Sequence, residues 1–167
     1  MSLIKNLGLE LQKTYTNILN KLNSIKGTKE SISKGFATGV AMSFTPFVGF
    51  HILLSLIVTK FTKQNAISAT LGTIAGNPWT FPFIWYLVLH TGNFILGRTY
   101  FLKSDELKVF FSQLFHAIIN LDFNLFLNDI WPIFLPMLIG CIPYYVLVWL
   151  FVSKVVFKAI SSKATQK

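Results

Sequence analysis

The chain has 167 residues, of which 53% are apolar and only 13% are charged. Because globular domains carry about 25% charged residues, this composition excludes an ordinary soluble protein and indicates an integral membrane protein. Fifteen Lys and Arg against six Asp and Glu give a net charge of +9, which gathers beside the apolar stretches. We therefore expect anionic membrane lipids as partners and no nucleic-acid partner.

Residues 1–30 are predicted to form an amphipathic N-terminal helix that lies on a membrane surface. Apolar residues recur every three or four positions, at 4, 7, 11, 15, 18, 22 and 25, and the lysines lie off that stripe. The same pattern would also suit a helix that packs on a partner subunit.

The first apolar stretch, residues 35–59, has no charged residue but is divided at Thr45-Pro46. Proline removes a backbone donor and disfavours a helical residue before it. We therefore predict two half-helices of about ten and thirteen residues, each too short to cross a hydrocarbon core of roughly 30 Å.

The second apolar stretch, residues 64–97, follows the same plan, with a small-residue helix, a break at Asn77-Pro78 and a bulky helix. This order indicates a weak internal repeat of roughly 35 residues, the kind from which transporters build sites at half membrane depth. The alternative is that two prolines kink two ordinary spanning helices.

The remaining chain completes the predicted domain plan. We expect an amphipathic interfacial segment at 109–128 and a last membrane segment at 131–152, within a membrane domain of residues 31–158 followed by a basic tail, 159–167. Every flank of the apolar stretches is positive, so re-entrant helices would keep more of the charge in the cytoplasm. Irregular backbone at membrane depth must be buried in protein or line a watery cavity, so we expect a homo-oligomer. The predicted fold class is an all-α integral membrane protein with broken or re-entrant helices.

Residues 31–97 contain several recognisable motifs: the small residues from Gly35 to Gly39, Pro46-x-x-Gly49-x-His51, Asn65, Gly72-Thr73 and Asn77-Pro78-x-Thr80. Together these motifs resemble the bacterial membrane family known as domain of unknown function 2062, with looser similarity through the last membrane segment. The chain departs from the family in having Lys63-Gln64-Asn65 where Arg-x-Asn is commoner, and His51 where Gln is frequent. The resemblance implies a multi-pass protein of the bacterial inner membrane. Some family members look fused to glycosyltransferases that act on lipid-linked sugars, which implies a glycosyltransferase as a partner.

The two breaks form the candidate site. Half-helices that begin after Pro46 and Pro78 would direct their backbone N–H groups toward one depth, where a phosphate-type headgroup could bind. The candidate ligand-binding residues are Thr45, Pro46, Gly49, His51, Asn77, Pro78, Thr80, Lys60, Lys63 and Arg98. Asn77 and Thr80 could instead cap the broken backbone, and His51 could be an ordinary interior histidine.

Composition also argues against catalysis. The uncharged stretches contain no carboxylate, and the three histidines lack the spacing of metal ligands, so we expect no enzyme activity, metal or cofactor. We predict a small transporter or flippase for an anionic lipid or lipid carrier. The alternative is a non-transporting membrane anchor or scaffold for a partner enzyme such as a glycosyltransferase.

Overall fold

The described part of the protein is entirely helical. The structure is a computed structural model that describes residues 2–47, 49–76, 80–98 and 104–164, and it contains no strand in these ranges. The elements are α1 (Ser2–Ser24), α2 (Lys29–Met42), α3 (His51–Phe61), α4 (Ala66–Gly72), the 3-10 turn η1 (Thr73–Ala75), α5 (Phe81–Ile95), α6 (Ser104–Asn120), α7 (Phe123–Leu125), the π-turn η2 (Phe126–Ile130) and α8 (Trp131–Ala164). The predicted all-α class is confirmed.

Both predicted interruptions are present. The first apolar stretch divides into α2 and α3, of 14 and 11 residues, and the second divides between η1 and α5. The helix α1 ends at Ser24, within the predicted N-terminal segment of residues 1–30, and α8 continues through Ala164, into the predicted basic tail of residues 159–167. The chain after residue 158 keeps its helical hydrogen bonding because residues 159–164 contain no glycine or proline.

The helices α2 and α3 form an antiparallel hairpin with its tip at residues 43–50. Its open ends are joined where Asn65 N donates to the Ser31 carbonyl at 3.1 Å and Ser31 Oγ donates to the Lys63 carbonyl at 3.4 Å. Farther along α2, Thr38 Oγ1 donates to Gln64 Oε1 at 2.5 Å. The chain therefore enters and leaves this hairpin on the same side.

The helix α4 returns beside α2 and runs parallel to it. Gly35 of α2 lies against Asn65, and Gly39 lies against Ala69 and Gly72. A Cβ atom at Gly39 would collide with the Ala69 carbonyl, so the two backbones approach this closely only because the residue is glycine.

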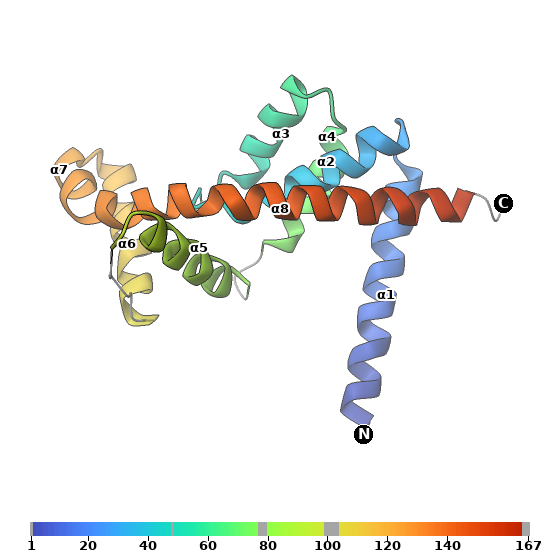
Figure 1. Cartoon of the computed structure of the whole chain (residues 1–167), viewed down its shortest axis with the longest axis horizontal. Helices are drawn as coiled ribbons and strands as arrows, with labels where there is room; N and C mark the ends of the chain where they lie inside the picture. Colours follow the sequence, from blue (N-terminus) through green and yellow to red (C-terminus); the bar gives the residue numbers. More distant parts are fainter. Residues whose placement is uncertain (1, 48, 77–79, 99–103, 165–167) are drawn as a thin grey trace.

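The 34-residue helix α8, about 50 Å long, is the scaffold for the other helices. Its C-terminal half packs on α2, where Trp149 Nε1 donates to Thr38 Oγ1 at 3.0 Å. Its N-terminal half packs on α5, where Gly92 lies against Pro136 and Gly140 lies against Val88. Consequently α2 and α5 follow one another along α8 and cover its two halves (Figure 1).

The helices α1 and α6 stand at opposite ends of α8. Leu22 of α1 packs with Ile32, Val156 and Ile160 near the C-terminus of α8. At the other end, Phe110 and Leu114 of α6 belong to the same apolar cluster as residues of η2 and early α8. Figure 1 shows α1 running steeply away from the axis of α8.

The molecule has two cores of different chemistry. In what we call the small-residue unit, formed by α2, α3, α4 and η1, the buried polar side chains are Ser33, Thr38, Ser43, Thr45, His51, Ser55, Thr59, Ser68 and Thr73. In what we call the aromatic unit, formed by α5, α6, η2 and the first half of α8, the buried cluster is Trp85, Val88, Leu89, Phe110, Leu114, Ala117, Ile130, Phe134, Met137 and Cys141.

One described helical run is long and apolar enough to cross a membrane. It extends through α7, η2 and α8, from Phe123 to Ser162. Only 28% of its most apolar window is buried inside the protein. Most of this surface is therefore available to something outside the chain.

Candidate binding site at the paired helix breaks

The first break follows α2 as a series of tight turns. Backbone N–H groups of Phe44 and Thr45 donate to carbonyls three residues earlier, both at 3.0 Å, and Thr45 Oγ1 donates to the Met42 carbonyl at 2.7 Å. Pro46 is buried, whereas Gly49 is exposed and has a φ of 81°. That positive φ suits glycine and lets the chain reverse before α3 begins at His51.

The second break separates η1 from α5. Gly76 N donates to the Thr73 carbonyl at 3.1 Å, and Thr80 Oγ1 reaches back across the break to the Ala75 carbonyl at 3.1 Å. Thr80 thus satisfies a carbonyl at the end of the first half-helix, which is the capping role considered for it from the sequence. Asn77 and Pro78 lie outside the described residues.

The two breaks lie side by side. A Cβ atom at Gly76 would meet Ser43 Oγ at 2.5 Å and the Phe81 ring at 3.0 Å. The His51 ring stacks on the Phe81 ring with centroids 5.2 Å apart. We call the cluster of Ser43, Thr45, His51, Gly76 and Phe81 the break junction.

Two polar atoms in the break junction are buried without a hydrogen-bond partner in the described structure, His51 Nε2 and Ser43 Oγ. His51 is 7% exposed and Ser43 is 1% exposed. The backbone of Thr45 lies beside the imidazole ring. A buried polar atom without a partner is destabilising by about 1–3 kcal/mol, so these two atoms are the strongest indication that the junction accommodates a polar ligand.

Four helix ends meet at the break junction. The helices α2 and η1 end there, which brings backbone carbonyl groups to the junction, and α3 and α5 begin there, which brings N–H groups. Phe50 and Thr80, the residues that precede α3 and α5, provide no capping side chain. The amide ends carry partial positive charge, so they favour an anionic group beside them.

The predicted basic residues lie away from the junction. Lys60 is in the last turn of α3, about 13 Å along the helix from His51. Lys63 lies between α3 and α4, next to Ser31. Arg98 follows the far end of α5 and donates to the Pro132 carbonyl at 3.4 Å. The structure therefore brings Thr45, His51 and Thr80 to the paired breaks but does not bring the three basic side chains there.

Sequence reasoning did not identify Ser43, Gly76 or Phe81. A signal for the first two was present, because the spacing that separates Gly39 from Gly72 also separates Ser43 from Gly76. Each of these pairs is in contact between α2 and the α4–η1 segment. The common spacing of 33 residues marks Ser43 and Gly76 as a pair like Gly39 and Gly72, but only the structure shows that the members of each pair touch.

A family model described as "Uncharacterized protein conserved in bacteria (DUF2062)" matches residues 12–167. The chain belongs to this family. The match confirms the resemblance inferred from the glycine and proline motifs, and it covers both the second half of α1 and the whole of α8. No curated protein and no solved structure matched the chain.

Proposed function

We propose that this DUF2062 protein is a multi-pass protein of the bacterial inner membrane that binds the phosphate-type headgroup of an anionic lipid or lipid carrier at the break junction. We further propose that it moves this lipid across the bilayer as a small transporter or flippase. The observation that carries the proposal is the pair of unpartnered buried atoms, His51 Nε2 and Ser43 Oγ, where four helix ends meet.

The inverted polarity of α3 supports a membrane environment. His51, Ser55 and Thr59 are buried on one face of the helix. The opposite face exposes the large apolar side chains Ile52, Leu53, Leu56 and Ile57. A surface helix in water has the reverse arrangement, whereas helices in lipid pack through small polar residues and expose their apolar side chains.

Polar groups inside a bilayer must find hydrogen-bond partners within the protein, and the hydroxyl groups on the buried face of α3 do so. Ser55 Oγ donates to the Ile52 carbonyl at 2.8 Å, and Thr59 Oγ1 donates to the Ser55 carbonyl at 2.8 Å. Each hydroxyl is thus satisfied within its own helix and needs no water. His51 differs from them because its Nε2 has no such partner.

The path of the chain supports two crossings and one re-entrant hairpin. The hairpin of α2 and α3 enters and leaves at the C-terminal end of α8. The α4–η1 segment then runs parallel to α2, and α5 continues along the other half of α8. This broken segment would form one crossing and α8 the other, with the break junction near half depth. Broken spanning helices with such a junction are the usual basis of substrate sites in secondary transporters.

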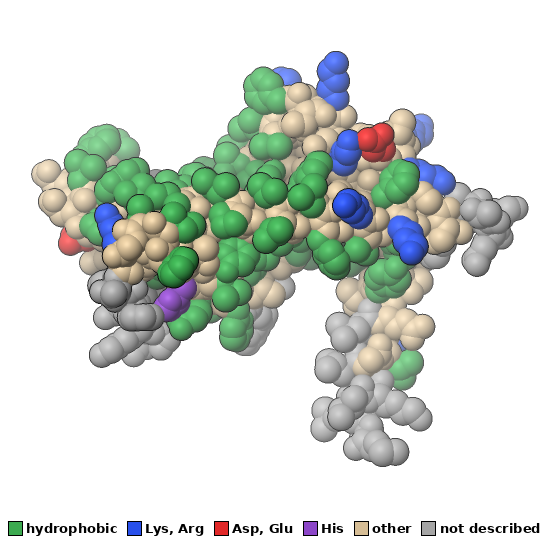
Figure 2. Space-filling view, in the orientation of Figure 1, with side chains coloured by type: hydrophobic (Ala, Val, Ile, Leu, Met, Phe, Trp, Pro, Cys, Tyr) green, Lys and Arg blue, Asp and Glu red, His purple; other side chains and the backbone are tan. Residues whose placement is uncertain are grey.

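The distribution of charge supports an orientation. The lysines at the C-terminal end of α8, which we call the lysine end, are Lys21, Lys26, Lys29, Lys34, Lys60, Lys63, Lys154 and Lys158. Figure 2 shows Lys and Arg side chains gathered on this side of the visible face and apolar side chains along α8. Between α5 and α8, by contrast, residues 98–129 contain three cations and four acids. By the positive-inside rule, we propose that the lysine end faces the cytoplasm.

The exposed tip of the first hairpin supports a homo-oligomer. Phe47 is 37% exposed, Phe50 is 50% exposed, and the Gly49 backbone between them is irregular. Irregular backbone is not tolerated against lipid tails. We therefore propose that a second copy of the chain covers this tip.

Headgroup binding would use hydrogen bonds that do not need lysine. When protonated, His51 can donate from Nε2 to a phosphate oxygen, and the Ser43 hydroxyl can donate beside it. The N-terminal ends of α3 and α5 would stabilise the same negative charge. Such a site offsets part of the desolvation penalty that a headgroup meets at half depth.

The test is transbilayer movement of fluorescent phosphatidylglycerol in proteoliposomes that contain wild type, His51→Ala or Ser55→Ala. Ser55 is the matched control because it lies one turn from His51 on the same buried face and donates only to its own helix. We expect movement above that of empty vesicles for wild type and Ser55→Ala, and a rate reduced about tenfold for His51→Ala. No movement with folded wild type would contradict transport of this lipid and would favour the anchor or scaffold function.

A further inference from the structure

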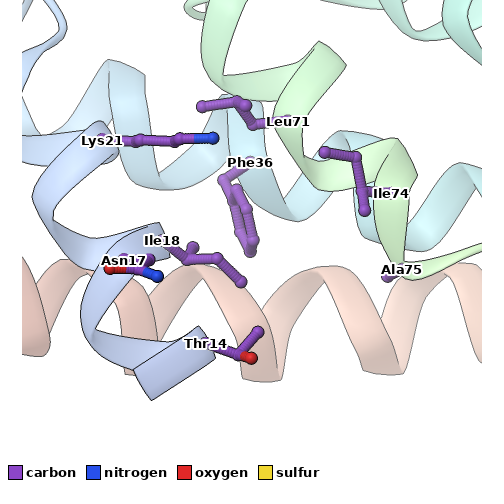
Figure 3. Close-up of a pocket in the computed structure, with 8 residues that line it drawn as sticks. All are labelled: Thr14, Asn17, Ile18, Lys21, Phe36, Leu71, Ile74 and Ala75. Carbon is purple, nitrogen blue, oxygen red and sulfur yellow. The ribbon is translucent and has the colours of Figure 1, made fainter. Parts of the chain in front are cut away.

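A cavity lies at the lysine end, between α1 and the small-residue unit. It has a volume of about 490 Å³ and opens to the outside. Its lining residues come from α1 on one side and from α2, α4 and η1 on the other: Thr14, Asn17, Ile18, Lys21, Phe36, Leu71, Ile74 and Ala75 (Figure 3). We call this cavity the α1 slot.

The two walls of the α1 slot differ in polarity. Thr14, Asn17, Ile18 and Lys21 form one face of α1 at helical spacing, and three of these four side chains are polar. The opposite wall consists of the apolar side chains Phe36, Leu71, Ile74 and Ala75. A ligand that suits both walls has a polar, charged part joined to a hydrocarbon part.

Charge determines which amphiphile fits. Among the described residues, the ion pairs join Lys13 to Glu10 and Lys34 to Glu30. No described carboxylate therefore neutralises the Lys21 ammonium group, which Figure 3 shows extending across the slot toward Leu71. An anionic headgroup would complement this charge, whereas a zwitterionic headgroup would bring its own cation close to Lys21.

The position of the slot points to a lipid source. Part of the apolar face of α1 stays exposed, including Tyr15 at 54% and Ile18 at 37%. At a membrane surface, this face would lie among the headgroups of the nearest leaflet. The volume falls within the range of about 300–1,000 Å³ typical of ligand sites, and it suits a phosphoglycerol group with the first part of an acyl chain.

We propose that the α1 slot binds an anionic phospholipid from the leaflet at the lysine end. Lys21 pairs with the lipid phosphate, Asn17 and Thr14 contact the glycerol region, and the acyl chain lies against Phe36, Leu71 and Ile74. This proposal rests on the proposed function in two respects: it places the lysine end at a membrane surface, and it makes the slot a loading site for lipid that the break junction binds.

The slot also has a structural connection to the break junction. Its inner wall ends at Ala75, and the next residue, Gly76, lies against Ser43. A lipid held in the slot is therefore beside the route that a headgroup would take to the junction. The slot is a loading site for the same class of lipid that the junction binds.

The test is native mass spectrometry of the full-length protein released from micelles that contain phosphatidylglycerol or phosphatidylcholine. Wild type should retain phosphatidylglycerol in preference to phosphatidylcholine. Lys21→Glu should reduce the retention of phosphatidylglycerol about tenfold. Lys13→Glu is the control, because Lys13 is an exposed lysine of the same helix and the change in net charge is identical.

A second variant tests the apolar wall. Ile74 is 66% exposed at the slot, so Ile74→Trp should fill the space without disturbing the core and should abolish retention of either lipid. Equal retention by Lys21→Glu and Lys13→Glu, or lipid retained by folded Ile74→Trp, would overturn the proposal. If Ile74→Trp does not fold, the two lysine variants decide the question.

Failure of this inference is distinguishable from failure of the proposed function. His51→Ala should slow lipid movement in proteoliposomes while it leaves phosphatidylglycerol retention in micelles unchanged, because His51 does not line the slot. Retention that depends on His51 but not on Lys21 would remove the slot and leave the break junction as the binding site. A helix of a second copy in the slot would instead appear as a dimer that Lys21→Glu dissociates, and this result would also overturn the lipid proposal.

Discussion

The small-residue unit and the aromatic unit achieve close packing in different ways. In the small-residue unit, Gly35, Gly39 and Gly72 let backbones touch, and buried hydroxyls such as those of Ser55 and Thr59 bond to carbonyls of their own helix. In the aromatic unit, large side chains such as Phe110 and Met137 fill the space between helices. The second arrangement would hold in water or in lipid. The arrangement in the small-residue unit places the apolar side chains of α3 on the protein surface. It therefore indicates that this surface faces lipid and not water.

The largest expected loss of stability comes from a substitution that leaves a cavity in the aromatic unit. Phe110 is 1% exposed, and Phe110→Ala should lower the free energy of unfolding by about 4 kcal/mol. Thermal unfolding in detergent followed by circular dichroism measures this loss. Phe123→Ala removes the same ring from a site that is 73% exposed and should change stability by less than about 0.5 kcal/mol.

The next largest loss of stability comes from a substitution that makes two backbones collide in the small-residue unit. Gly39→Leu would force α2 away from α4 at Ala69 and should destabilise the protein by about 3 kcal/mol. Gly8→Leu is the control, since a Cβ atom at Gly8 has no neighbour within 4 Å. Elution of Gly39→Leu as a folded species with wild-type melting temperature would contradict direct contact between these helices.

A comparison of two buried threonines tests whether a hydroxyl that links helices contributes more stability than one that bonds within its own helix. Thr38 and Thr59 are both 0% exposed, but Thr38 links α2 to Gln64 and Trp149, whereas Thr59 bonds within α3. Thr38→Val should therefore destabilise the protein by about 2 kcal/mol because it leaves the Trp149 donor unpaired. Thr59→Val should be within about 0.5 kcal/mol of wild type. Chemical unfolding of both variants in one detergent tests this difference.

The smallest effect depends on pH at the lysine end. The Lys34 ammonium group, 2.6 Å from Glu30, lowers the pKa of that carboxyl below its ordinary value of 4.5. A lowered pKa in the folded state stabilises the protein above pH 4.5, and this contribution is lost as the pH falls through the lowered pKa. Melting curves of wild type and Glu30→Gln should thus converge on acidification and differ slightly at neutral pH, because the pair is exposed.

The features that follow from local rules could be predicted from the sequence. Proline chemistry at Pro46 located the first break, and the small residues from Gly35 to Gly39 indicated close helix contact. The polar stripe of α3 was also readable, since His51, Ser55 and Thr59 recur at every fourth residue.

The features that depend on tertiary arrangement could not be predicted. Lys60 follows His51 closely in the sequence, yet a rigid helix holds the two side chains apart. The contact between Ser43 and Gly76 arises only because α2 and α4 pack in parallel, and no single segment encodes that arrangement. The packing of α5 on α8, where Gly92 lies against Pro136, likewise joins segments that are far apart in the sequence.

The most direct test of the account is to measure whether hydrocarbon or water surrounds the apolar face of α3. Cys141 is the only cysteine, so Cys141→Ser gives a background in which nitroxide labels can be attached at Leu53 and Ile57 in lipid nanodiscs. The account predicts that molecular oxygen, which concentrates in hydrocarbon, relaxes both labels more strongly than a water-soluble nickel chelate does. Preferential relaxation by the nickel chelate at both positions would place this face in water and contradict the membrane-embedded hairpin.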